Sequence, residues 1–157
     1  MELIQTRSNK FNLKWAIIAF ILAYIVITIL AVGLYYAIAV PMGISLTAEF
    51  NLRKDAAYLL AEKIYPLLNM LVWASFSWMY FKQSNTQNTW KQAWMLGGFW
   101  LAIVLPLDYV SFVAVTNPLS LSAYDFYIAQ FPWIYLTYLA VLISPAIYIA
   151  CVKKINQ

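Results

Sequence analysis

The sequence contains no histidine and a single cysteine, Cys151. The missing imidazole excludes haem ligated by histidine, histidine-containing zinc sites and catalysis with histidine as the general base. One cysteine forms neither an intrachain disulfide nor a thiolate cluster. We interpret Cys151 as an apolar residue at a helix end, with palmitoylation as the alternative. The sequence therefore predicts no cofactor, no haem and no metal site.

Charge is also scarce. Only 10% of the 157 residues are charged, whereas 64% are hydrophobic and 18% aromatic. Soluble domains carry roughly 25% charged residues, so this composition indicates a membrane protein. The net charge of +4 comes from basic residues dispersed at the edges of apolar runs. Because they form no stripe or patch, we expect the lipid bilayer as a partner and no nucleic acid.

Long uncharged runs predict four transmembrane helices. The first run, residues 15–40, exceeds the roughly 20 residues that cross a hydrocarbon core. A cleaved signal peptide is the competing interpretation, because "AIA" at 37–39 is similar to a cleavage site, but the run is much longer than a usual signal sequence. All four spans cover approximately residues 15–40, 56–81, 93–115 and 127–152. The predicted fold is an all-α, integral membrane four-helix bundle in a single domain, 1–157.

Two local patterns refine this architecture. "SAYD" at 122–125 offers Ser122 as an N-cap and Asp125 as an acidic third position, which predicts the start of the last helix. "SLTAEF" at 45–50 is similar to "SLSAYDF" at 120–126, which would superpose the first helical hairpin on the second. We keep both interpretations of this similarity, a duplication and a chance likeness of two outer loops.

Basic residues predict the orientation. Cytoplasmic loops carry an excess of lysine and arginine. Arg53 and Lys54 lie on one predicted side. The other side holds seven basic residues: Arg7, Lys10, Lys14, Lys82, Lys91, Lys153 and Lys154. We therefore expect a multi-pass protein of the plasma (inner) membrane, with both termini cytoplasmic.

Each predicted span has one face of polar and small residues at steps of three and four, which suits the interior of a bundle. These faces are Tyr24, Thr28, Ala31 and Tyr35; Glu62, Pro66, Asn69, Trp73 and Ser77; Gly97, Leu101, Val104, Asp108 and Ser111; and Gln130, Thr137, Ser144 and Tyr148. Interhelical hydrogen bonds in membranes contribute only about 0.6 kcal/mol on average. Packing alone accounts for most of these residues.

The charged residues inside the spans need a further reason, since a charge at mid-membrane costs about 2.5–3.5 kcal/mol on insertion scales. Glu62 and Asp108 both lie about 10 Å below the outer edge at 1.5 Å per residue. We predict an ion pair between Asp108 and Lys63 with Glu62 beside it. In the alternative, Lys63 extends outward and the acids meet water at the rim. The candidate polar site comprises Glu62, Lys63, Asp108, Asn69, Tyr35, Tyr65, Tyr109 and Gln130.

The sequence contains no phosphate-binding glycine loop and no spacing typical of metal ligands. We predict a noncatalytic subunit or accessory factor whose outer polar cluster fixes the packing or binds a membrane-protein partner or a second copy of the chain. One alternative is a small oligomeric ion-coupled transporter that uses Asp108 or Glu62. Another is an intramembrane lipid-binding protein or lipid-modifying enzyme with acid–base chemistry at the same carboxylates.

Overall fold

The structure, a computed structural model, describes residues 9–44, 55–116 and 120–155. Within these residues the chain forms four long α-helices and two short π-helical segments. They are α1 (Leu13–Ala39), α2 (Ala56–Gln83), α3 (Trp90–Tyr109), η1 (Val110–Ala114), η2 (Tyr124–Ile128) and α4 (Trp133–Ile155). The all-α bundle predicted from the sequence is confirmed.

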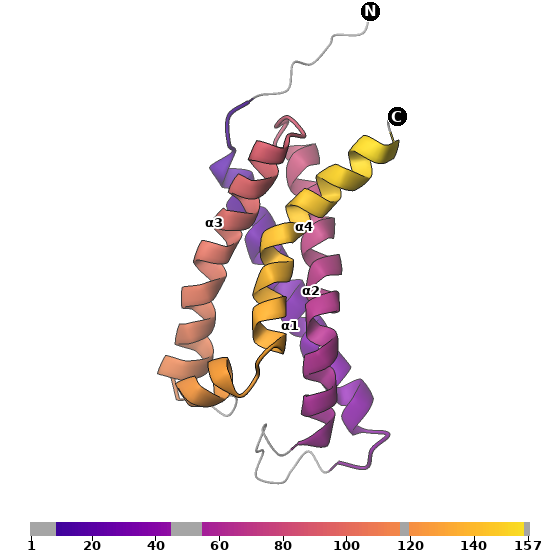
Figure 1. Cartoon of the computed structure of the whole chain (residues 1–157), viewed down its shortest axis with the longest axis vertical. Helices are drawn as coiled ribbons and strands as arrows, with labels where there is room; N and C mark the ends of the chain where they lie inside the picture. Colours follow the sequence, from indigo (N-terminus) through magenta and orange to yellow (C-terminus); the bar gives the residue numbers. More distant parts are fainter. Residues whose placement is uncertain (1–8, 45–54, 117–119, 156–157) are drawn as a thin grey trace, which may run out of the picture.

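The long helices lie lengthwise beside one another (Figure 1). α2 packs against both α1 and α4, and α3 packs against α4. The beginning of α1, the α2–α3 connection and the end of α4 lie at one end of the bundle, which we call the terminal end. η1 and η2 lie at the opposite end.

Polar side chains cap the N-termini of three of the helices. The Asn12 side chain accepts a 3.2 Å hydrogen bond from the Trp15 amide at the start of α1. Asp55 accepts bonds of 2.8 and 3.0 Å from the first amides of α2. Thr89 accepts a 3.3 Å bond from the Gln92 amide in α3. Each cap satisfies a backbone N–H that has no partner within its own helix.

The last predicted helix differs from the structure at its beginning. Ser122 Oγ accepts from the Asp125 amide at 3.0 Å and donates to the Asp125 carboxylate at 2.7 Å, so the predicted cap is present. It begins only the short η2, and α4 starts later, at Trp133. The cause is Pro132, which has no N–H to donate to a preceding turn and is best placed at a helix start.

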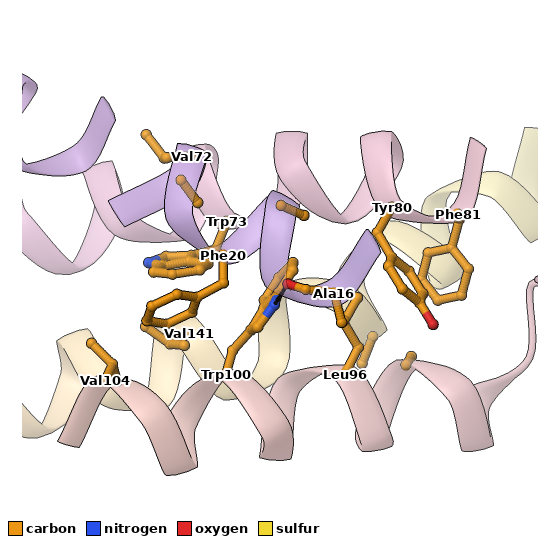
Figure 2. Close-up of a cluster of buried hydrophobic side chains, with 14 of the residues drawn as sticks. Ala16, Phe20, Val72, Trp73, Tyr80, Phe81, Leu96, Trp100, Val104 and Val141 are labelled. Atoms are coloured by element: carbon orange, nitrogen blue, oxygen red, sulfur yellow. Dashed lines mark hydrogen bonds between the residues drawn. The ribbon is translucent and has the colours of Figure 1, made fainter. Parts of the chain in front are cut away.

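Large aromatic residues fill the core (Figure 2). The rings of Trp73 and Trp100 lie 5.0 Å apart between their centroids, and Phe20 lies 5.5 Å from Trp73. Trp100 is fully buried and its indole N–H donates a 2.9 Å hydrogen bond to the carbonyl of Ala16. The core thereby joins α1, α2 and α3 without leaving this indole donor unsatisfied.

α3 and α4 approach closely at one glycine. A Cβ added to Gly97 would overlap the backbone carbonyl of Leu142, whereas a Cβ on the neighbouring Gly98 would meet no atom within 4 Å. Gly97 therefore permits backbone contact between two helices, as small residues do in membrane bundles.

Three helical segments have the length and apolar composition to cross a membrane: Leu13–Ala39, Trp90–Ala114 and Trp133–Lys154. α2 is equally long, but Glu62, Lys63 and Asn69 make it less apolar. A membrane location is therefore plausible. The count of four spans remains a prediction.

Some sequence predictions concern residues outside the described ranges. The segment 45–50, on which the proposed duplication depends, is one of them, and so are Arg7, Arg53 and Lys54. The duplication thus stays a prediction.

Candidate functional site

A cavity of about 530 Å³ lies in the half of the bundle away from the terminal end. Its lining comes from the second half of α1, the first half of α2, the end of α3 with η1, the η2 region and the first half of α4. Its walls are mainly apolar and aromatic. Among these aromatic residues are Tyr35 on α1, Tyr65 on α2 and Tyr138 on α4.

Asp108 holds a central position in this cavity. The Tyr24 hydroxyl on α1 donates to Asp108 Oδ1 at 2.9 Å, and the Tyr138 hydroxyl on α4 donates to Oδ2 at 3.2 Å. Because both carboxylate oxygens accept a hydrogen bond from a neutral donor, the arrangement suits an ionised side chain. One carboxylate on α3 therefore links three helices.

The predicted ion pair between Asp108 and Lys63 is wrong. Lys63 is exposed and does not line the cavity, and Asp108 instead bonds with the two tyrosines. Successive residues of an α-helix point about 100° apart. Glu62 is buried and lines the cavity, whereas the adjacent Lys63 is exposed and does not line it. The alternative interpretation, in which Lys63 extends outward, describes its position better.

Six of the eight predicted site residues line the same cavity, and two do not. Lys63 and Tyr109 are exposed on the outer surface of their helices. The six that line the cavity are Tyr35, Glu62, Tyr65, Asn69, Asp108 and Gln130. Helical spacing thus predicted most of the polar residues that line the cavity. It did not predict the direction in which each side chain points from its helix.

Two of these six have their polar atoms engaged by the protein itself. Tyr35 donates a 2.7 Å hydrogen bond to Asp55, the residue that caps α2. Asn69 donates to the Tyr65 carbonyl at 2.9 Å and accepts from the Trp73 indole at 3.1 Å. These contacts hold the wall of the cavity in place. They also give the buried indole N–H of Trp73 a hydrogen-bond acceptor.

Gln130 differs from them. Its side chain is only 5% exposed and lines the cavity, and Nε2 has no hydrogen-bond partner among the described residues. A buried amide donor without a partner costs about 1–3 kcal/mol. A polar atom placed beside this amide would satisfy it.

Tyr138 was missed by sequence reasoning, and Tyr24 was placed on an interior face but not in the site. Tyr24 lies four residues before Thr28 and so shares a helix face with it, which could have placed Tyr24 in the site. Tyr138 lies in the second turn of α4, so its orientation depends on where that helix begins.

The π-helical segments form one side of the cavity. The Phe112 ring on η1 stacks on the Phe126 ring on η2, with centroids 5.8 Å apart and planes 13° from parallel. Both rings line the cavity. In residues 9–44, 55–116 and 120–155, no group of three or more cysteine, aspartate or glutamate residues is placed to hold a metal ion. What the lining offers is two carboxylates, two amides and several phenols on an aromatic wall.

Such a lining can hold a molecule that has an apolar body and a small polar part, since ligand sites combine apolar walls with a few placed polar groups. A scan against protein-family models, a search of the curated proteins and a search of the solved structures each found no match to this chain.

Proposed function

We propose that the protein is a noncatalytic integral membrane protein whose cavity binds an amphiphilic ligand. The single observation that carries this proposal is the cavity itself, about 530 Å³ in volume, with Asp108, Glu62 and Gln130 set in an aromatic wall. Sites for drug-sized ligands measure roughly 300–1,000 Å³ and have this mixture of surfaces. The described lining residues include no histidine, lysine or cysteine, so a hydroxyl there has no imidazole or amine beside it as a base.

The surface of the bundle supports a membrane environment for α2 as well. The outward face of α2 carries Leu67 and Leu71, which are 55% and 60% exposed. No charge interrupts the helix from Ile64 to Phe81, a length of about 27 Å at 1.5 Å per residue. That length approaches the roughly 30 Å hydrocarbon core. We therefore propose four spans.

The described basic residues support an orientation with both termini in the cytoplasm of a cell bounded by a plasma (inner) membrane. The Lys82 ammonium lies 4.8 Å from the centroid of Trp78, and the Lys153 ammonium lies 5.6 Å from that of Trp90. Tryptophan is enriched at both membrane interfaces, whereas an excess of lysine and arginine marks the cytoplasmic one. Six basic residues lie at or beside the terminal ends of their helices: Lys10, Lys14, Lys82, Lys91, Lys153 and Lys154.

Native mass spectrometry tests ligand binding. Protein purified from its native membrane in a mild detergent should carry an amphiphile adduct of defined mass. Ala31→Phe, which fills the cavity from α1, should remove that adduct. Ala37→Phe is the matched control, because Ala37 is exposed on the same helix and outside the cavity. Equal adduct occupancy in both variants would contradict the proposal.

A second candidate is a small ion-coupled transporter, and the bonds of Asp108 favour it. Protonation of this carboxylate would weaken its acceptance of the Tyr24 and Tyr138 hydrogen bonds and so change the link between α1, α3 and α4. Reconstituted protein would then show a flux driven by a pH gradient, which Asp108→Asn abolishes without loss of fold. A membrane-protein partner or a second copy of the chain, expected from the sequence, remains a prediction under either function.

A further inference from the structure

We propose that the polar part of the ligand is an organic cation, an ammonium group attached to an apolar body. This inference rests on the proposed function and adds the chemical class of the ligand. It is carried by the charge of the cavity, by its aromatic wall and by the buried amide of Gln130.

The charge of the cavity is negative. Glu62 and Asp108 line it, and the described lining residues include no lysine or arginine. The hydrogen-bond partners of Asp108 are the neutral hydroxyls of Tyr24 and Tyr138, so within the described ranges no cationic side chain balances this carboxylate. Buried charges in proteins are normally paired, because removing a lone charge from water costs several kcal/mol. A ligand cation would supply the missing positive charge, whereas an anion would be repelled.

The aromatic wall suits the same ligand. The faces of tyrosine and tryptophan rings attract cations, most strongly where water is excluded, by about 0.5–2 kcal/mol. Such rings lie on α1, α2 and α4 around the two carboxylates, among them Tyr24, Trp73, Trp133 and Tyr138. Since the remaining walls are apolar, the body of the molecule would be a hydrocarbon or an aromatic group.

Gln130 provides an independent indication of a ligand. Its buried Nε2 has no hydrogen-bond partner in the described structure, and the residue lines the same cavity as Asp108. An amide N–H is satisfied by an oxygen acceptor. We therefore infer that the ligand carries an oxygen, such as an ether, ester or phosphate oxygen, near its cationic group.

Two sources supply this chemistry. One is the ammonium headgroup of a membrane lipid, and the other is a free organic cation that enters from the membrane. They differ in the phosphate that lipid headgroups carry. The two carboxylates disfavour a phosphate, whereas the Gln130 amide favours it, so the experiment below includes an arm for each source.

Binding of two probes of the same shape and opposite charge tests the inference. The full chain, purified in dodecyl maltoside, is dialysed to equilibrium against tetraphenylphosphonium or tetraphenylborate, with protein-free micelles as the blank. We expect saturable binding of the phosphonium, with an affinity about tenfold or more above that of the borate. Equal affinities, or tighter binding of the borate, would overturn the inference.

Variants locate the binding. Asp108→Asn should weaken phosphonium binding about tenfold, since it removes a partly buried counter-charge with little change in volume. Asp125→Asn, the same chemical change outside the cavity, should leave it unaltered. Gel filtration and helical circular dichroism check the fold, and Glu62→Gln replaces Asp108→Asn if the latter does not fold. Unaltered affinity in a folded Asp108→Asn or Glu62→Gln variant would overturn the inference.

Competition separates the two sources. If dodecyltrimethylammonium and dodecylphosphocholine both displace the phosphonium, the site accepts a lipid headgroup. If only dodecyltrimethylammonium does, the ligand is a free organic cation. Either result supports an ammonium site, whereas displacement by neither overturns it. Binding of the borate alone would refute a cationic ligand but would still be compatible with an amphiphile site. If neither probe binds and the native protein carries no adduct, the proposed function is refuted as well.

Discussion

The Tyr24 hydroxyl on α1 donates a 2.9 Å hydrogen bond to Oδ1 of Asp108 on α3, across 84 residues of sequence. This contact lies in the cavity, and the Tyr24 ring stacks on Phe20 of the aromatic core with centroids 5.9 Å apart. It therefore connects the stability of the bundle to the state of the candidate site.

Tyr24→Phe removes this bond while it keeps the ring. Hydrogen bonds to charged groups contribute about 1.5–3 kcal/mol in soluble proteins, and interhelical bonds in membranes average about 0.6 kcal/mol. We expect Tyr24→Phe to lower the free energy of unfolding by about 1 kcal/mol, measured by titration of mixed micelles with dodecyl sulfate. In an Asp108→Asn background the loss should be smaller. Strictly additive losses in the double mutant would show that the two side chains are not coupled.

Gly97 and Gly98 form a matched pair of positions. Gly97→Ala places a Cβ against the Leu142 carbonyl and must push α3 away from α4. We expect it to lower the free energy of unfolding by about 1–3 kcal/mol, the usual effect of overpacking. Gly98→Ala meets open space and should be neutral or slightly stabilising. Similar destabilisation by both substitutions would refute the close approach of the two helices.

The sequence predicted which face of α2 is buried. Glu62, Asn69, Trp73 and Ser77 recur at helical spacing, and each is buried in the bundle. This success has a simple cause, because a periodic pattern fixes which residues share a face. It does not fix how far that face is rotated toward a neighbouring helix.

The rotation of each helix about its axis explains why some site predictions were wrong. Both charges of the Glu62–Lys63 pair were assigned to one cluster, although only Glu62 lines the cavity and Lys63 is exposed. The partners of Asp108 were equally out of reach, since Tyr24 and Tyr138 reach it from two other helices. Which segments form helices follows from local composition. Which side chains contact one another in the site depends on how the helices pack together.

The two tryptophans of α3 also form a comparison. Trp100 is fully buried and donates to the Ala16 carbonyl, whereas Trp94 is 49% exposed. Trp100→Phe removes the indole donor and part of the core volume, so we expect a loss of about 2–4 kcal/mol in the free energy of unfolding. Trp94→Phe should cost less than about 0.5 kcal/mol. Thermal unfolding in detergent, followed by circular dichroism, compares the two, and equal melting temperatures would contradict the core described for α3.

The proposed orientation has its own test. In a Cys151→Ala background, Gln83→Cys near the α2–α3 connection and Ala123→Cys beside η2 place single thiols at opposite ends of the bundle. Both positions are exposed. A membrane-impermeant maleimide added to intact cells should label Ala123→Cys and label Gln83→Cys only after permeabilisation. The reverse pattern would invert the orientation, and labelling of both in intact cells would refute four complete spans.

Photo-cross-linking tests the central claim, that the cavity binds an amphiphile, most directly. An alkyl trimethylammonium with a diazirine in its chain is activated on the purified protein, and the modified residues are located by peptide mass spectrometry. We predict modification of cavity residues such as Tyr24 and Trp133, and its loss in Ala31→Phe. Modification confined to outward residues such as Ile29 and Leu71, which are 64% and 60% exposed, and unchanged by Ala31→Phe, would contradict the claim.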